Sequence, residues 1–282
     1  MKIITSAKEM QQTASDLKKQ GKIIGFVPTM GFLHEGHLSL VNKSVSESDI
    51  TVMSIFVNPL QFGPGEDFET YPRDMQRDQL LAEEVGVDIL FTPDVTELYP
   101  VEPSVKVQAV KRTEVLCGAS RPGHFDGVVT VLSILFNLVK PDKSFFGQKD
   151  AQQAAVVEGL VKSLHFPIEI IPVQTVREDD GLAKSSRNVY LSDEERQEAP
   201  VIYQSLKSSA DIYLSQGIEP AIEHFQKQIA AISGEIDYVD ILSYPELQEP
   251  APEDHRLIIA AAVKFKQARL IDNVIFSTKE EI

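Results

Sequence analysis

Short apolar runs alternate with amphipathic segments along the first two thirds of the chain, and this alternation limits the folds that are open to it. The apolar runs are too short for confident helices and lie at residues 23–28, 50–57, 87–91, 144–146 and 168–176. Segments with a helical pattern lie between them, at residues 37–45, 73–85, 128–139 and 150–164. Because strands that alternate with helices form parallel βαβ units, the pattern predicts an α/β fold with a doubly wound parallel sheet.

The last third of the chain has a different pattern. It predicts helices at residues 192–216 and 219–232, followed by strands at residues 238–242, 257–265 and 269–276. Helices followed by a run of strands are typical of an α+β domain, and 282 residues are enough for two domains. We therefore expect a larger domain over residues 1–185 and a smaller C-terminal α+β domain over residues 186–282.

Charge and cysteine content exclude several classes of protein. The chain carries 27 Lys and Arg residues against 42 Asp and Glu residues, a net charge of −15. Nucleic-acid binding depends on neutralising phosphates with basic side chains, so we expect no nucleic-acid partner. The single cysteine, Cys117, excludes an intrachain disulfide and fits a reducing compartment. Because the sequence has no apolar run of about 18 residues and no signal-peptide pattern, we also expect no membrane partner and a cytoplasmic location.

The segment PTMGFLHEGH at residues 28–37 connects the first apolar run to the next helical segment. His34 and His37 are three residues apart, so they lack the spacing of an HExxH zinc site. Gly31 and Gly36 have the spacing of a P-loop, but the Lys and Ser/Thr that complete a P-loop are missing. What remains is a pair of imidazoles at a glycine-flanked helix start, where free backbone N–H groups and the helix dipole favour a phosphate. A loop with two surface histidines is the alternative.

The segment DGLAKSSRN at residues 180–188 gathers hydroxyl and basic side chains. Ser185 and Ser186 lie between Lys184 and Arg187, and such a set can clamp a polyphosphate. An ordinary polar loop is the alternative. A histidine-bearing helix start paired with a downstream basic and serine-rich loop is more specific. This pairing resembles the ATP site that the class I aminoacyl-tRNA synthetase and nucleotidyltransferase group uses for adenylation.

Two more segments follow predicted strands. In FFGQKDAQQ (residues 145–153), Lys149 is well placed for a phosphate and Asp150 for a ribose hydroxyl, with a solvated helix cap as the alternative. In FVNPLQFG (residues 56–63), the amide side chains can orient a small polar substrate, with simple turn chemistry as the alternative. Covalent catalysis is disfavoured, because Cys117 has no histidine near it in the sequence and no GxSxG motif occurs.

Taken together, these segments resemble the signatures of one family across nearly the whole chain. They are PTMGFLHEGH, FVNPLQFG, EDFETYPRD (residues 66–74), RPGHFDGVVTV (residues 121–131), FFGQKDAQQ, VREDDGLAKSSRN (residues 176–188) and ARLIDN (residues 268–273). Their order is that of the pantothenate synthetase (pantoate–β-alanine ligase) family in the class I nucleotidyltransferase superfamily. The resemblance implies a Rossmann-like first domain, a smaller C-terminal domain that closes over the site, and a homodimer.

The resemblance also implies a two-step reaction that uses Mg²⁺ and ATP. The pantoate carboxylate attacks the α-phosphorus of ATP, which gives pantoyl adenylate and pyrophosphate. The amine of β-alanine then attacks the acyl carbon, which gives pantothenate and AMP. Adenylation installs a good leaving group on a carboxylate, and preset donors can stabilise the charge that develops at phosphorus.

The roles of individual residues follow from the same resemblance. The implied catalytic residues are His37, as the candidate acid, with His34, Lys149 and Arg187. The implied ATP-binding residues are Met30, Gly31, Phe32, Leu33, His34, Glu35, Gly36, His37, Gly147, Gln148, Lys149, Asp150, Val176, Lys184, Ser185, Ser186 and Arg187. The implied pantoate-binding residues are Met30, Gln61 and Gln153, with Asn58 and His124 nearby. No metal ligands are named by the motifs.

Two other functions stay open beside this ligase. One is an adenylyl- or cytidylyltransferase of the same superfamily that acts on a different acid or phosphate, and the other is a nucleotide-binding sensor without turnover. The pair Gln61 and Gln153 favours the ligase, since it is a substrate feature, and the intact His34 and His37 argue against a sensor. The sequence departs from the family at Ile134, where members usually have a lysine, so any helper role of that lysine is in doubt.

Overall fold

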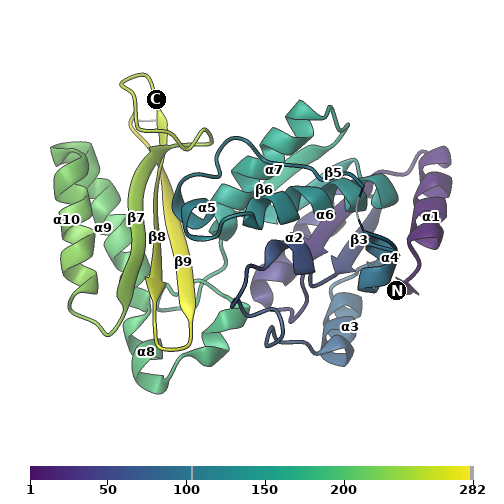
Figure 1. Ribbon diagram of the computed structural model, residues 1–282, viewed down its shortest axis with the longest axis horizontal. Coiled ribbons are helices and arrows are strands. Elements are labelled where there is room, and N and C mark those ends of the chain that lie inside the picture. The colour runs from purple at the N-terminus through teal and green to yellow at the C-terminus, as the bar shows by residue number, and fades with distance from the viewer. Residues whose placement is uncertain (103, 280–282) are drawn as a thin grey trace. The chain divides into compact units, whose positions relative to one another are not determined.

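Figure 1 shows the computed structural model, which describes residues 1–102 and 104–279. The chain divides into two compact units. The first unit comprises Met1–Val110, Arg121–Gln148 and Val156–Gln174, and the second comprises Lys111–Ser120, Lys149–Ala155 and the chain from Thr175 onward. Two short earlier segments and residues 175–185 thus pack with the C-terminal part. The functional division into residues 1–185 and 186–282 stays a prediction.

The described part of the first unit contains a six-stranded sheet. In chain order its strands are β1 (Lys2–Ile4), β2 (Ile24–Thr29), β3 (Ile50–Ile55), β4 (Ile89–Phe91), β5 (Lys143–Gly147) and β6 (Glu169–Val173). All neighbours are parallel, in the order β1-β4-β3-β2-β5-β6. Strands β3 and β4 extend the sheet on one side of β2, and β5 and β6 extend it on the other. The carboxyl ends of β2 and β5 therefore meet at a topological switch point, where sheets of this kind bind ligands.

Helices pack on both faces of this sheet. The helices that begin in the first unit are α1 (Ala7–Lys19), α2 (Glu35–Glu47), α3 (Met75–Glu84), α4 (Val95–Leu98) and α6 (His124–Val139), while α7 (Ala151–Ser163) begins in the second unit and ends in the first. Adjacent residues of a strand point to opposite faces of the sheet, so the contacts of Phe26 and Val27 in β2 show what covers each face. Val27 packs in a core cluster with residues of α2 and α3. The ring of Phe26 meets that of Phe136 in α6 edge-on, with 6.3 Å between the centroids. The predicted doubly wound α/β fold is confirmed.

The position of β6 explains a proline within a strand. Pro172 interrupts the predicted strand at residues 168–176, and proline cannot donate a hydrogen bond to a sheet. Strand β6 is an edge strand that pairs only with β5 in the described sheet, and Pro172 lies opposite Phe146 there. An edge strand tolerates the missing donor, because one of its sides is unpaired.

The second unit contains an antiparallel sheet with helices against it. Its strands are β7 (Glu235–Ser243), β8 (Arg256–Lys264) and β9 (Arg269–Ser277), and its remaining helices are α5 (Leu116–Ser120), α8 (Asp193–Glu198), α9 (Pro200–Gln216) and α10 (Ile218–Ile229). Helices α9 and α10 lie side by side against this sheet (Figure 1). Leu206 of α9, Phe225 of α10 and Ile259 of β8 are completely buried in the shared core. The predicted smaller α+β part of the fold is confirmed.

The prediction of one helix over residues 192–216 is wrong, because the chain forms two helices there. Helix α8 begins with a capping box between Ser192 and Glu195, and α9 begins at Pro200. Proline has no N–H to donate, so it fits the first turn of a new helix better than the interior of a long one. Strand β1 and helix α1 were not predicted, although Ser6 accepts a hydrogen bond from the Glu9 N–H at the start of α1. None of the described helices is long and apolar enough to cross a membrane.

Candidate active site

The predicted histidine segment lies at the carboxyl end of β2, where this strand leads into α2. The turn between them uses left-handed backbone at two successive residues, with φ of +84° at Gly31 and +50° at Phe32. A Cβ on Gly31 would lie only 2.9 Å from Ile55 Cγ2 and 3.0 Å from Asp78 Oδ2. Glycine is therefore required here both for its backbone conformation and for space.

Most backbone N–H groups of this loop donate within the chain. Gly31 donates to Thr29 Oγ1 (3.2 Å), and Phe32 and Leu33 donate to the two oxygens of Asp78 (2.7 Å each). His34 donates to His37 Nδ1 (3.3 Å), Gly36 to His34 Nδ1 (3.1 Å) and His37 to the His34 carbonyl (2.8 Å). The expectation that these amides are free for a phosphate is corrected, because Thr29, Asp78 and the capping arrangement of the helix use them. The side chains of His34 and His37 are therefore the candidate donors of this loop to a phosphate.

The capping bonds fix the protonated nitrogen of both imidazoles. His34 caps α2 and His37 is its third residue, and in each ring Nδ1 accepts a backbone hydrogen bond. A nitrogen that accepts carries no proton, so in the neutral ring the proton is on Nε2. The two ring centroids are 4.1 Å apart, so the loop places the two imidazoles, each with its proton on Nε2, next to each other. This arrangement can bind adjacent oxygens of a phosphate chain.

Asp78 is a residue of this site that the sequence analysis missed. It lies in the first turn of α3, its exposed fraction is 1%, and it holds the Phe32 and Leu33 amides. Burial raises the pKa of its carboxyl, although the two N–H groups act in the opposite direction. The sequence did not distinguish Asp78 from an exposed acidic residue in the first turn of a helix, because its hydrogen-bond partners lie about 45 residues away in the chain.

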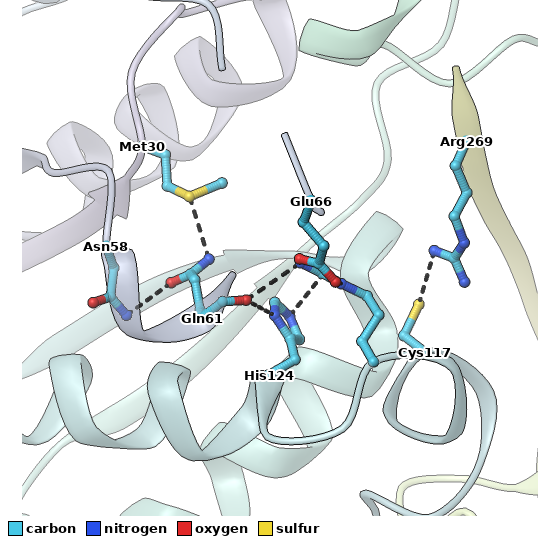
Figure 2. Close-up of polar contacts among 8 residues, drawn as sticks. Met30, Asn58, Gln61, Glu66, Cys117, His124 and Arg269 are labelled. Carbon is cyan, nitrogen blue, oxygen red and sulfur yellow. Dashed lines mark hydrogen bonds and ion pairs between the residues drawn. The ribbon is translucent and has the colours of Figure 1, made fainter. Parts of the chain in front are cut away.

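The amides of FVNPLQFG form a buried network after β3 (Figure 2). Asn58 Oδ1 accepts from the Leu60 N–H (3.2 Å) and from the Tyr99 hydroxyl (2.9 Å). Asn58 Nδ2 donates to the Gly127 carbonyl and to Gln61 Oε1, at 3.1 Å each. An asparagine side chain has two donors and two acceptor sites, and Asn58 uses all four within the chain while only 1% exposed.

This network orients Gln61. Because Asn58 donates to Oε1, the amide nitrogen of Gln61 points elsewhere, and Nε2 lies 3.2 Å from Met30 Sδ (Figure 2). The side chain is 9% exposed, so the structure brings Met30, Asn58 and Gln61 together as predicted neighbours. Burial raises the pKa of Tyr99, so its hydroxyl stays protonated. Gln61 can therefore present N–H donors, which suit an oxygen-rich ligand.

His124 joins the same network at the start of α6. Arg121 Nη1 lies 3.2 Å from His124 Nε2, and since arginine only donates, Nε2 accepts and Nδ1 carries the proton toward the Gln61 carbonyl at 2.8 Å. Arg121 also binds Glu66 with two hydrogen bonds, of 2.8 and 2.5 Å. The hydrogen bond from Arg121 holds the pKa of Glu66 below its usual range. His124 thus positions the segment around Gln61, and a contact between His124 and pantoate stays a prediction.

The carboxyl end of β5 carries the other predicted groups of the first unit, Gly147 and Gln148. A Cβ on Gly147 would find no heavy atom of the described residues within 4 Å, its chain neighbours aside. The strand end is therefore open enough for a ligand to approach the backbone. This strand is the neighbour of β2 at the switch point.

In the second unit, the start of α7 holds Lys149, Asp150 and Gln153. The side chain of Asn273 in β9 donates to the Lys149 carbonyl (2.9 Å). Gln152 donates to two carbonyls of the segment before α5, those of Arg112 (2.9 Å) and Val115 (2.8 Å). These bonds fix the backbone from which Lys149 and Gln153 project. Asp150 is exposed.

The loop at residues 176–188 is the remaining part of the predicted site. The Lys184 N–H donates to the Val176 carbonyl (2.9 Å). This bond does not involve the other two backbone groups of the pair, the Val176 N–H and the Lys184 carbonyl. Lys184 Nζ also forms an ion pair with Glu178 (2.8 Å). Ser185 Oγ accepts from the Arg187 N–H (3.3 Å) and caps the short helix η3 (Ser186–Tyr190).

Two features bear on other chemistries. The described residues contain no group of three or more His, Cys, Asp or Glu side chains that could hold a metal ion. Cys117 is buried, and its Sγ lies 3.2 Å from the Tyr238 hydroxyl and 3.7 Å from Arg269 Nη1 (Figure 2 shows the second contact). Its contacts are those of a packed structural thiol.

Comparisons with known proteins show the family to which the chain belongs. The sequence model described as pantoate-beta-alanine ligase matches residues 2–275. A protein of Bacillus pumilus named pantothenate synthetase is 56% identical over 282 residues, which is 99% of this chain and 98% of that protein. The crystal structure of pantothenate synthetase from Thermus thermophilus is 43% identical with a TM-score of 0.90, and the similarity covers 97% of this chain and 99% of that one.

A further solved structure is similar and contains ligands. It is pantoate-beta-alanine ligase from Francisella tularensis in complex with β-γ ATP and β-alanine, 34% identical with a TM-score of 0.82. The similarity covers 98% of this chain and 97% of that one. Because the sequence model and these relatives cover nearly the full length, the chain belongs to the pantoate–β-alanine ligase family.

Proposed function

We propose that this protein condenses pantoate with β-alanine at the expense of ATP, through a pantoyl-adenylate intermediate. The observation that carries the proposal is the pair of Nε2–H donors on His34 and His37, placed at the carboxyl end of β2. The similarity to a ligase whose structure contains an ATP compound and β-alanine supports the choice of substrates.

The proposed reaction has two balanced steps. A carboxylate oxygen of pantoate forms a bond to the α-phosphorus, the bond from that phosphorus to the leaving oxygen breaks, and pyrophosphate departs. The amine of β-alanine then forms a bond to the acyl carbon, the bond from that carbon to the phosphate oxygen breaks, and AMP departs with loss of a proton from the amine. His34 and His37 donate hydrogen bonds to phosphate oxygens whose charge grows in the first step.

The remaining predicted residues take roles in the same scheme. In the first unit, Gln61 and Met30 hold pantoate, and the loop at residues 30–37 and the Gly147 backbone meet the nucleotide. In the second unit, Lys149, Ser185, Ser186 and Arg187 hold the β- and γ-phosphates, and Asp150 meets the ribose. Gln153 also binds pantoate, while the Val176 N–H and the Lys184 carbonyl suit the acceptor and donor edge of an adenine.

Three further properties belong to the proposal. Mg²⁺ enters with ATP and is held mainly by phosphate oxygens and water, as is usual for this ion, and it neutralises phosphate charge. The protein acts as a homodimer, and it works in the cytoplasm. The metal ion and the dimer rest on the resemblance to the family, and the location rests on the sequence features described above.

A single substitution tests the catalytic assignment. We expect His37→Ala to lower the rate of pantoate-dependent pyrophosphate release by roughly 100-fold, since a preset donor to the transition state is lost. His224→Ala removes an imidazole from α10 and serves as the matched control. Near-normal turnover by His37→Ala would remove His37 from the mechanism.

A further inference from the structure

The turn that leads into His34 and His37 has a backbone conformation that is unfavourable without contacts from other parts of the fold. Gly31 and Phe32 both have left-handed backbone, with φ of +84° and +50°. For a residue other than glycine this conformation costs about 1–2 kcal/mol, so a neighbouring element has to stabilise it. The elements that touch this turn therefore decide where the histidines lie.

Asp78 makes the strongest contacts with the turn. Oδ2 accepts from the Phe32 N–H and Oδ1 from the Leu33 N–H, both at 2.7 Å, and the residue is 1% exposed. One carboxylate thus bridges two successive amides that immediately precede His34. Hydrogen bonds to a charged acceptor in a buried site are stronger than neutral ones.

Arg77 contacts the same turn from the adjacent position of α3. Its Nη1 donates to the Leu33 carbonyl (2.9 Å), and its guanidinium carbon lies 5.4 Å from the centre of the Phe32 ring. The two neighbouring side chains thus hold both N–H groups and the following carbonyl. Leu33 is completely buried in the core between β2, α2 and α3.

We propose that Asp78, supported by Arg77, is a positioning residue that sets the turn at residues 31–33 and thereby places His34 and His37 for adenylation. Asp78 acts through the backbone that enters α2, since both of its carboxylate oxygens accept from amides of the turn. The inference rests on the proposed function, because adenylation is the reaction that uses the two imidazoles.

The test uses the full chain and the single-turnover rate of pyrophosphate release from Mg-ATP and pantoate. Asp78→Asn keeps the shape of the side chain but places an amide N–H₂ group opposite a backbone N–H. We expect the rate to fall by about 10- to 100-fold, because a small misplacement of catalytic groups has effects of this size. The KM for β-alanine should change little, since that substrate enters after adenylation.

A double-mutant cycle separates positioning from general damage. If Asp78 acts through the histidines, Asp78→Asn should lower the residual rate by less than about threefold once His34 and His37 are both alanine. An equal loss in both backgrounds would overturn the proposal, as would wild-type activity of Asp78→Asn. Asp74→Ala is the matched control, because Asp74 is exposed and caps α3 through the Arg77 N–H (3.1 Å). It should lower the melting temperature while the rate stays within about twofold.

Two measurements keep the test decisive if a variant folds poorly or the substrate differs. Arg77→Ala removes the carbonyl contact from a side chain that is 46% exposed, so the protein should fold, and its rate should fall less than that of Asp78→Asn. The ¹⁵N shifts of the imidazoles report directly on the Nε2–H form of His34 and His37. A normal shift pattern in Asp78→Asn would overturn the proposal. If the wild type releases no pyrophosphate with pantoate, the proposed function fails, whereas altered shifts in Asp78→Asn would still support the positioning role.

Discussion

Asn58→Asp tests whether a buried amide orients the ligand-facing amide of Gln61. The two backbone partners of Asn58 fix its orientation, since the Leu60 N–H can only donate and the Gly127 carbonyl can only accept. The second proton on Nδ2 then goes to Gln61 Oε1, which leaves Gln61 Nε2 as the donor. Aspartate has the same shape but offers an acceptor where Asn58 offers a donor.

The substitution has two consequences of different kinds. The Gly127 carbonyl loses its donor and faces a carboxylate, which costs about 1–3 kcal/mol and lowers the melting temperature by about 2–10 °C. The Gln61 amide turns so that Nε2 donates to the new carboxylate. Oε1, an acceptor, then takes the place of the Nε2 donor in the pantoate site. A lost hydrogen bond with an unpaired acceptor is worth about 1.4–2.8 kcal/mol, so the KM for pantoate should rise about 10- to 100-fold.

The assay is the rate of pyrophosphate release as a function of pantoate at saturating Mg-ATP, repeated with ATP varied. We expect the KM for ATP to stay within about threefold, and Asn58→Asp to have little further effect in a Gln61→Ala background. Tyr99→Phe is the control, because a hydroxyl can donate or accept and does not decide the orientation of the amide. Equal increases of both KM values, or additive effects with Gln61→Ala, would show that Asn58 does not act on pantoate through Gln61.

Two further predictions concern packing and charge. A Cβ on Gly127 would lie 2.3 Å from the Leu60 carbonyl oxygen and 2.6 Å from the Gln61 backbone nitrogen. Gly127→Ala should therefore lower the free energy of unfolding, measured with denaturant, by about 1–3 kcal/mol. It should also raise the KM for pantoate but not the KM for ATP. Burial alone would raise the pKa of Asp237, but hydrogen bonds from Lys264, Arg269 and Ser120 lower it to about 2. A lowered carboxyl pKa stabilises the fold above its ordinary value of 3.8, and this contribution is lost as the pH falls through about 2. Asp237→Asn should therefore unfold with about 1–2 kcal/mol less free energy at pH 7, and the two proteins should converge only below about pH 2. An unchanged difference across this pH range would contradict the prediction.

The sequence predicted most of the fold because local signals agreed with the tertiary structure. The apolar runs of β2 and β3 are buried strands of a parallel sheet, and Pro172 marks an edge strand. The prediction of a long helix over residues 192–216 was wrong because helical spacing continues across Pro200, although this proline starts a new helix.

The sequence indicated candidate residues for the site but not the contacts that these residues make. Motifs indicated His34, His37 and Gln61, yet the pattern could not tell that the loop amides are used for capping. Asp78 was missed because its role depends on a hydrogen bond to Phe32, 46 positions away. The spacing of residues in the sequence identifies neighbours within one helix or strand. Contacts such as that of Asp78 with Phe32 form only when two elements pack together.

Pyrophosphate release measures directly whether the chain activates pantoate by adenylation. We expect pyrophosphate only when both Mg-ATP and pantoate are present, and multiple turnovers to AMP and pantothenate when β-alanine is added. Binding of ATP without pantoate-dependent pyrophosphate would contradict adenylation of pantoate, and the assignment of Gln61 and Gln153 to pantoate would be the first to be withdrawn.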